Sequence, residues 1–418
     1  MKVAVTGCCH GELDATYKQI RDLEEKNNYK VDLVLINGDF EAIRNHQDLK
    51  CMAVPDKYQH LGTFYKYYTE ETTAPVLTIV IGGNHEASNY MWELYHGGWL
   101  APNIYYLRGS GCVKVNGLRI AGASGIYKGY DYRLGHHERM PYDKSSVRSA
   151  YHTRFYDVMK LRQLSSPDVF MSHDWPVNIT QYGDVAALLK YKPTFRSDIE
   201  KGELGSPPMM DLLRSLRPSY WFSAHMHSKF EAFVNHESES AESGSKVNPH
   251  GEGDTVVASA SAEKLKDTQP PPNKSTYFLA LDKCLPRRPY MHVLDLNPVA
   301  PGSDLGISPP IITFDREWLA ISRALHPYLS TCRQQPSLPP VWDMARIIQE
   351  SQRWVDENVG EREIRNVQEF TRTAPGPVNT NPRPPNNLQL PPSYSNPQTE
   401  AFCAMLGLDN KVNPPPAK

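Results

Sequence analysis

Side chains that bind transition metals recur at the ends of short apolar runs in the N-terminal half of the chain. In residues 78–86, the apolar run TIVI leads into two glycines and then Asn84, His85 and Glu86. A run of this composition is typical of a buried strand, and two glycines permit a sharp turn after it. Ligands of open α/β sheets bind beside such strand ends. This stretch therefore predicts a ligand-binding corner.

Four further apolar runs end in side chains of the same kind. Together the five strand ends supply a set of candidate metal ligands, namely Cys8, His10, Asp39, Asn84, His173, His225 and His227. Imidazoles, an amide, a thiolate and a carboxylate able to bridge are the ligands that a pair of transition metals needs. Two such metals activate water and clamp a phosphate for in-line attack. The set predicts phosphoester hydrolysis, and the alternative is a collection of turn and capping residues.

The elements that must position these residues alternate between strand and helix up to about Phe233. Strands are predicted at 2–6, 31–36, 76–81, 169–171 and 220–222, with a helix at 13–28 and a hairpin at 113–121. Polar residues directly after these strands gather on one edge of a sheet. The pattern predicts an α/β (α+β) fold.

Composition sets the class of protein. The 418 residues are 40% hydrophobic and carry a net charge of −2, so a sizeable core is expected and a nucleic-acid partner must be argued from a local patch. No apolar run reaches the roughly 20 residues that span a bilayer, and the N-terminus does not resemble a signal peptide. The seven scattered cysteines predict reduced thiols in an intracellular protein with no membrane partner.

Four motifs resemble those of the RNA lariat debranching enzymes, which are calcineurin-like metallophosphoesterases. They are GCCHGE at 7–12, GDFEAIRN at 38–45, GGNHEASN at 82–89 and SHDWP at 172–176. Stretches at 278–286 and 316–320 are similar to that family's C-terminal region, and the resemblance reaches about Leu325. It implies a calcineurin-like β-sandwich flanked by helices, with a smaller C-terminal module.

The resemblance also implies roles for the strand-end residues. One metal pocket would use Cys8, His10, Asp39 and His227, a second would use Asp39, Asn84, His173 and His225, and His85 would be the general acid. Cys8 stands where the wider superfamily has Asp. Because a thiolate is a softer ligand, the expected cofactor is one or two ions of Fe²⁺, Zn²⁺ or Mn²⁺ and not Mg²⁺.

A basic, tyrosine-rich region is the expected contact with RNA. Between Ile104 and Asp168 there are eleven Lys or Arg against five Asp or Glu. Basic groups neutralise phosphates and aromatic rings stack on unpaired bases. The candidate substrate-binding residues are Arg44, Asn45, Tyr127, Tyr130, Tyr132 and Arg133. The alternatives are a surface ion pair for Arg44 and tyrosines that only pack against the sheet.

Composition shifts divide the chain into segments. Residues 1–235 form the expected catalytic domain with a recognition loop at about 125–152, 236–254 a flexible insertion, 255–370 the C-terminal module and 371–418 a disordered Pro-rich tail. The tail is a candidate docking segment for splicing or RNA-turnover proteins. Within it, 399–408 is the one piece with helical spacing, and weak local helicity is the preferred interpretation there.

The predicted function is hydrolysis of the 2′-5′ phosphodiester bond at the branch point of excised intron lariat RNA. This role implies a nuclear enzyme, with shuttling to the cytoplasm left open. One alternative is a metallophosphoesterase that acts on 3′-5′ nucleic acid, a nucleotide or a phosphoprotein. Another is a non-catalytic RNA-binding partner of the splicing machinery.

Overall fold

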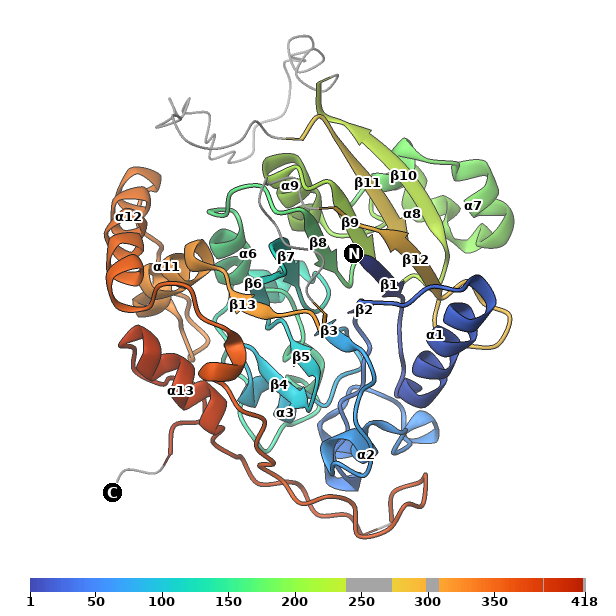
Figure 1. The fold of residues 1–418 in the computed structure, drawn as a ribbon, viewed down its shortest axis with the longest axis horizontal. Helices are drawn as coiled ribbons and strands as arrows, with labels where there is room; N and C mark the ends of the chain where they lie inside the picture. The colour runs from blue at the N-terminus through green and yellow to red at the C-terminus, as the bar shows by residue number, and fades with distance from the viewer. Residues whose placement is uncertain (238–272, 298–307, 386, 416–418) are drawn as a thin grey trace.

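Two mixed β-sheets form the centre of the molecule (Figure 1). The computed structural model describes residues 1–237, 273–297, 308–385 and 387–415. The first sheet has the strand order β12-β1-β2-β3-β5-β4 and the second the order β10-β11-β9-β8-β7-β6-β13. In the first, β1, β2, β3 and β5 run parallel, and in the second β7, β8, β9 and β11 do.

The strands are short. Those of the first sheet are β1 (Lys2–Thr6), β2 (Leu33–Asn37), β3 (Leu77–Ile81), β4 (Gly98–Ala101), β5 (Ile104–Tyr106) and β12 (Met291–Asp295). Those of the second are β6 (Ser110–Val115), β7 (Leu118–Ala123), β8 (Val169–Ser172), β9 (Tyr220–Ser223), β10 (Phe230–Asn235), β11 (Ser275–Ala280) and β13 (Ile312–Phe314).

Helices connect and cover the sheets. They are α1 (Leu13–Asn27), α2 (Phe64–Tyr68), α3 (Ser88–Glu93), α4 (Gly129–Tyr132), α5 (Ser146–Ser149), α6 (Phe155–Leu161), α7 (Val185–Tyr191), α8 (Arg196–Lys201), α9 (Pro207–Leu216), α11 (Arg316–Leu325), α12 (Val341–Asn358) and α13 (Pro397–Leu406). None of the helices in the described ranges is long and apolar enough to cross a membrane.

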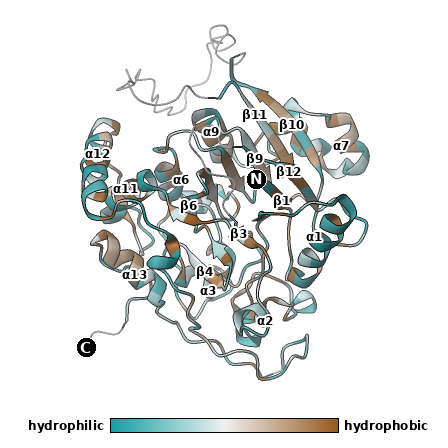
Figure 2. Ribbon diagram, in the orientation of Figure 1, coloured by the Kyte–Doolittle hydropathy of each residue, from teal (hydrophilic) through white to brown (hydrophobic). Residues whose placement is uncertain are grey.

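The sheets pack face to face because their strands are apolar on both sides. Leu35 and Ile79 of the first sheet share one buried cluster with Ile120 and Met171 of the second. Runs rich in Val, Ile and Leu are buried on both faces in this way when other layers cover the sheets. Figure 2 shows brown strand segments at the centre and a largely teal α12 at the periphery.

Helices cover the two outer faces. Tyr17 and Ile20 of α1 pack on the outer face of the first sheet. On the second sheet, α6, α9 and α11 bury side chains that include Leu213 and Trp318. The arrangement is a layered α/β fold of two mixed sheets flanked by helices, so the predicted sandwich is confirmed.

The C-terminal region contributes strands to both sheets. β11 lies between β9 and β10, β12 pairs antiparallel with β1, and β13 pairs antiparallel with β6. The sequence predicts a smaller C-terminal module packed on the first domain, and in the described residues the strands of this region also complete both sheets. Strands this short cannot bury their apolar faces without a sheet to join. Nearly all of the predicted insertion at 236–254, and a strand expected at 255–260, lie outside the described residues.

The prediction of a disordered tail is wrong for the part of residues 371–418 that the structure describes. Phe402 and Leu406 of α13 are fully buried in the cluster between the sheets. The side chain of Gln398 accepts a hydrogen bond from Trp99 N at 2.7 Å and donates one to Trp99 O at 2.9 Å. This amide pairs with β4 at the edge of the first sheet, as a further strand would.

The extended part of the tail follows the surface below α2 in Figure 1, and Arg44 anchors it. The fully buried Arg44 guanidinium donates to Asp48 at 2.9 Å, to Glu93 at 2.8 Å and to the Thr373 hydroxyl at 2.9 Å. Asn45 is also buried and donates to Pro375 O at 2.8 Å. The structure thus contradicts the prediction that Arg44 and Asn45 contact substrate, because carboxylates and tail groups already occupy their donors.

Truncation of one tail leucine tests whether the tail is part of the core. Replacing the fully buried Leu406 with Ala should lower the free energy of unfolding by about 2–5 kcal/mol, because a cavity remains in a packed core. The matched control is Leu390→Ala, in the same tail at 48% exposure, which should change stability little. Equal, small effects in urea denaturation would indicate a disordered tail.

Candidate metal centre

The predicted ligands meet at one edge of the two packed sheets, where strands of both sheets end. Cys8 and His10 follow β1, Asp39 follows β2, and Asn84 follows β3. The second sheet supplies the others, with His173 after β8, and His225 and His227 after β9. Because these strands are parallel within each sheet, their carboxyl ends share one edge. The structure therefore brings together all seven side chains named from the sequence.

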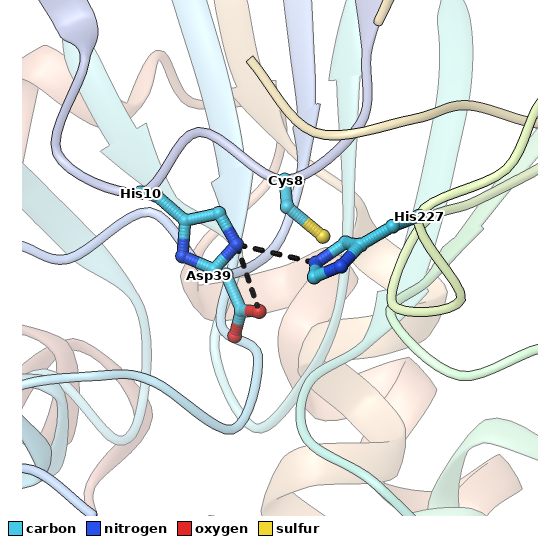
Figure 3. Close-up of side chains that lie close together, drawn as sticks. All are labelled: Cys8, His10, Asp39 and His227. Carbon is cyan, nitrogen blue, oxygen red and sulfur yellow. Dashed lines mark hydrogen bonds and ion pairs between the residues drawn. The ribbon is translucent and has the colours of Figure 1, made fainter. Parts of the chain in front are cut away.

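Four of these side chains form a compact donor set. The ligand atoms of Cys8, His10, Asp39 and His227 all lie within 4.8 Å of one another. Figure 3 shows His10 facing both partners: its Nε2 is 3.3 Å from His227 Nε2 and 3.8 Å from Asp39 Oδ2, and the Cys8 thiol points toward the same space.

The remaining ligands lie on the other side of Asp39. His173 Nε2 is 3.4 Å from Asp39 Oδ1 and 3.2 Å from Asn84 Oδ1. The ring of His225 is 4.9 Å from that of His173, measured between centroids. The two oxygens of Asp39 therefore face different groups of ligands, as a bridging carboxylate requires.

The donor set fits divalent transition metals. The facing ring nitrogens of His10 and His227 form a hydrogen bond when one of them carries a proton, and they offer two lone pairs to a cation when neither does. Thiol and imidazole donors suit zinc or ferrous iron, and the amide and carboxylate oxygens beside His173 also suit manganese.

The electrostatics of the site favour the ligand forms of Asp39, His225 and His227. Burial alone would raise the pKa of Asp39, but attraction and hydrogen bonding from His173 outweigh it and hold the pKa well below its usual range. Burial and the neighbouring His10 lower the pKa of His227 to about 3. Burial and His173 likewise lower the pKa of His225. The carboxylate is therefore ionised, and both of the latter imidazoles are neutral with a free lone pair.

Outer contacts orient two of the histidines. Glu41 Oε1 lies 3.1 Å from Nδ1 of His10, and the carbonyl oxygen of Asn37 lies 2.8 Å from Nδ1 of His173. A proton on Nδ1 leaves Nε2 as the metal-facing atom in each ring. Glu41 is not among the site residues that the sequence predicts. Asp39 and Glu41 both have positive φ, 44° and 62°, so the alternation that assigns side chains to faces does not apply between them.

Glu86 holds the loops after β2 and β3 together. Its carboxylate accepts hydrogen bonds from the backbone N–H groups of Phe40 at 2.8 Å, Glu41 at 2.9 Å and Gly83 at 2.9 Å. Burial, with Asp39 nearby, raises its pKa to about 7. Glu86 thus links the backbones of the two loops through one buried side chain.

His85 lies beside the four-ligand set. Its backbone N–H donates to Asp39 Oδ1 at 2.9 Å, and its half-buried ring meets the ring of His10 edge-on at 5.3 Å between centroids. Its ring nitrogen also lies within 4.8 Å of ligand atoms of His10 and Glu41. His85 is therefore close enough to the centre to exchange a proton with a molecule bound there.

The predicted recognition loop is attached to the metal-ligand motifs. Gly125 N donates to Gly82 O at 2.9 Å, and Tyr127 N donates to Asp174 Oδ2 at 3.2 Å. A small cavity of about 80 Å³ lies between the loop and the end of β3, with Gly83 and Tyr151 among its lining residues. The loop therefore roofs a space that adjoins the metal ligands.

Some tyrosines of the loop pack against other aromatic rings, and one is exposed to solvent. The half-buried rings of Tyr127 and Tyr132 contact each other at 5.3 Å, and Tyr132 also meets Phe155. Tyr130 is 75% exposed, and Arg133 is exposed as well. Among the predicted substrate contacts, Tyr130 and Arg133 are thus the side chains most free to meet a large ligand.

Adjacent glycines provide a test of the centre. A Cβ added to Gly83 would lie 2.2 Å from Asp39 Oδ1 and 2.4 Å from Asp39 N, whereas one added to Gly82 would have its nearest contacts at 3.4 Å. Gly83→Ala should therefore displace the Asp39 carboxylate and lower metal content of the purified protein. Gly82→Ala is the matched control and should retain metal. Full metal content in the Gly83→Ala protein, measured by mass spectrometry, would contradict the assignment of Asp39.

Comparison with known proteins covers nearly the whole chain. Residues 1–229 match the calcineurin-like phosphoesterase family, and residues 273–411 match the lariat debranching enzyme C-terminal domain. The second match overturns the expectation that the resemblance ends near Leu325, because it takes in most of the Pro-rich tail.

Individual relatives are similar over comparable lengths. The chain is 45% identical over 415 residues to lariat debranching enzyme A of Xenopus laevis. The aligned region covers 98% of this chain and 70% of that protein. It is 41% identical over 470 residues to the lariat debranching enzyme of Schizosaccharomyces pombe, covering 100% and 98%. The Homo sapiens enzyme is 43% identical, covering 98% and 69%. The chain belongs to the lariat debranching enzyme family.

Proposed function

We infer that this chain hydrolyses the 2′-5′ phosphodiester bond at the branch point of lariat RNA. The product is a linear RNA with a free 2′ hydroxyl on the branch nucleotide and a 5′ phosphate on its former partner. One observation carries the inference: a basic, tyrosine-bearing loop is hydrogen-bonded at Gly82 and Asp174 to the motifs that hold the metal ligands. Phosphate chemistry and nucleic-acid contact therefore occur in one place.

We assign the metal ligands as two groups that share Asp39. The first is Cys8, His10, Asp39 and His227, and the second is Asp39, Asn84, His173 and His225. Divalent ions held there would supply an activated water and neutralise charge on the phosphate. The thiol of Cys8 favours Zn²⁺ or Fe²⁺ over Mg²⁺ in the first group, and Mn²⁺ remains a candidate for the second.

We assign His85 as the general acid that protonates the departing 2′ oxygen. The hydrogen bond from its backbone N–H to Asp39 Oδ1 fixes the loop beside the ligands while leaving the imidazole free of them. No ring nitrogen of His85 has a hydrogen-bond partner in the described ranges, so a substrate oxygen has no competitor there. An imidazole is well suited to this role, since its ordinary pKa is near neutrality.

RNA recognition is assigned to the loop at 125–152. Tyr130 offers an exposed ring for base stacking, and Arg133 offers an exposed guanidinium for a phosphate. Lys128 lies on the same exposed segment and adds positive charge. The half-buried Tyr127 and Tyr132 pack against each other beneath these exposed side chains and do not themselves face solvent fully.

The proposed role places the protein in the nucleus, where intron lariats are released. The proposed protein partners are splicing or RNA-turnover factors, for which the exposed residues of the Pro-rich segment, such as Val378, are candidate contacts. The competing enzyme function is hydrolysis of another phosphoester. The metal ligands recognise a phosphate and not its neighbours, so the choice between the two rests on substrate comparison.

Substitution of His85 separates proton transfer from metal binding. His85→Ala should lower turnover by roughly 10²–10⁴-fold while metal content stays at the wild-type level. Asp39→Asn and His173→Ala are the contrasting variants and should lose metal together with activity. Metal content by mass spectrometry, measured on the same samples as the rate, distinguishes the two classes. Loss of metal in the His85→Ala protein would make His85 a ligand and remove the general-acid assignment.

Substrate choice is tested with matched RNAs. A branched 2′-5′ oligonucleotide should be cleaved at least 10²-fold faster than its linear 3′-5′ counterpart, because the loop and the ligands engage the branch together. The assay is run anaerobically with iron, zinc and manganese supplied separately, since oxygen oxidises both ferrous iron and an exposed thiolate. Equal rates on the two RNAs would replace debranching with general phosphodiesterase activity.

A further inference from the structure

Buried nitrogen donors without acceptors gather where α11 and α13 meet the second sheet. Arg108 is 1% exposed, and its three guanidinium nitrogens have no hydrogen-bond partner in the part of the chain that the structure describes. The same holds for Nε1 of the fully buried Trp318, and Nε2 of the buried His96 has no partner there either, whichever tautomer the ring adopts. Unpaired buried donors are rare in folded proteins, and a group of them requires an explanation.

These donors surround two aromatic rings. Arg108 Cζ lies 4.4 Å from the ring centroid of Phe402 and 6.0 Å from that of Trp318. The ring of His96 stacks on Phe402 at 5.1 Å, and Lys160 Nζ lies 4.7 Å from the Trp318 ring. The donors therefore belong to one compartment, between β6, α6, α11 and α13.

One face of α11 adds a further unpaired group. Ser322 lies one turn after Trp318, and its buried hydroxyl also lacks a partner in the described residues. His326 follows after another turn, with its ring 5.8 Å from that of His96. The helix thus presents a row of polar groups toward the same compartment.

The compartment has more positive than negative charge. Asp157 attracts Lys160, but its carboxylate already accepts from Tyr95 at 2.9 Å, from Ser110 at 3.0 Å and from His136 at 2.8 Å. Burial lowers the pKa of Lys160 to about 8, so the ammonium form predominates at neutral pH. Arg108 is cationic at any physiological pH.

The neighbouring hydroxyl of Tyr105 does not meet the need of Arg108. It lies close enough to favour the charged guanidinium, but it donates its own proton toward Gln368 Oε1 at 3.3 Å and can accept from few of the Arg108 N–H groups. One neutral hydroxyl is in any case too few for five N–H donors. A buried cation in this state is costly unless a counter-charge accompanies it.

We propose that this compartment binds a small inorganic anion of the size and charge of chloride. Guanidinium, indole N–H and hydroxyl groups are donors without acceptors, which is the complement that a halide requires. A single negative charge balances the excess, whereas a dianion such as phosphate would exceed it. The anion would hold α13 in place, since Phe402 contacts both Arg108 and His96. This site is separate from the metal ligands and does not depend on the proposed function.

Thermal unfolding of the full chain tests the proposal. At constant ionic strength, exchange of gluconate for chloride or bromide should raise the Tm of the wild type saturably by about 2–5 °C, because the ion binds only the folded state. Arg108→Met should abolish this shift. The matched control is Arg44→Met, which removes a buried arginine whose donors are ion-paired and should leave the chloride shift intact.

A second variant and a second measurement keep the outcome decisive. If the Arg108→Met protein does not fold, Trp318→Phe removes the indole N–H together with part of the ring and should reduce the shift. Crystals grown in bromide should give an anomalous peak beside Arg108. The proposal is overturned by equal Tm in chloride and gluconate, by an unchanged shift in both variants, by stabilisation with phosphate alone, or by the absence of the bromide peak.

Discussion

The buried carboxylate of Asp39 is the group on which the arrangement of the site depends. One of its oxygens faces His10 and the other faces His173, so this one side chain contacts both groups of candidate ligands. Holding it requires a left-handed backbone at Asp39 and a neighbour without a Cβ at Gly83. The loops that satisfy these conditions are joined through Glu86. The sandwich is therefore a support that aligns loops from two sheets at one point.

The strand ends could be predicted from the sequence because each carries its own local signal. An apolar run, a turn residue and a metal-binding side chain are contiguous at Asp39, Asn84 and His173, and parallel strands place such ends on one edge. Local signals therefore sufficed to predict that these side chains lie together. The residues that support those ligands, such as Glu41, were missed because their orientation depends on backbone angles that composition does not encode.

The tail could not be predicted because its stability comes from contacts that are remote in the chain. Pro375, Asn381 and Pro382 supply carbonyl oxygens to donors on Asn45, His46 and Leu61, more than 300 residues away. A Pro-rich sequence has few backbone N–H donors, so local sequence patterns predict that it is disordered. Arg44 was predicted to contact substrate for a related reason. From the sequence alone, an arginine that binds a phosphate cannot be told from one that pairs with two buried carboxylates, as Arg44 does.

The pairing of the Gln398 side chain with the backbone of Trp99 has a consequence for association between molecules. An open sheet edge invites a strand from another chain, and natural proteins protect such edges with charges, bulges or covering segments. Here a primary amide reproduces the donor and acceptor of a strand at one residue, and the helix that carries it stands in the path of any further pairing. The tail thus protects the β4 edge of the first sheet from pairing with a strand of another copy.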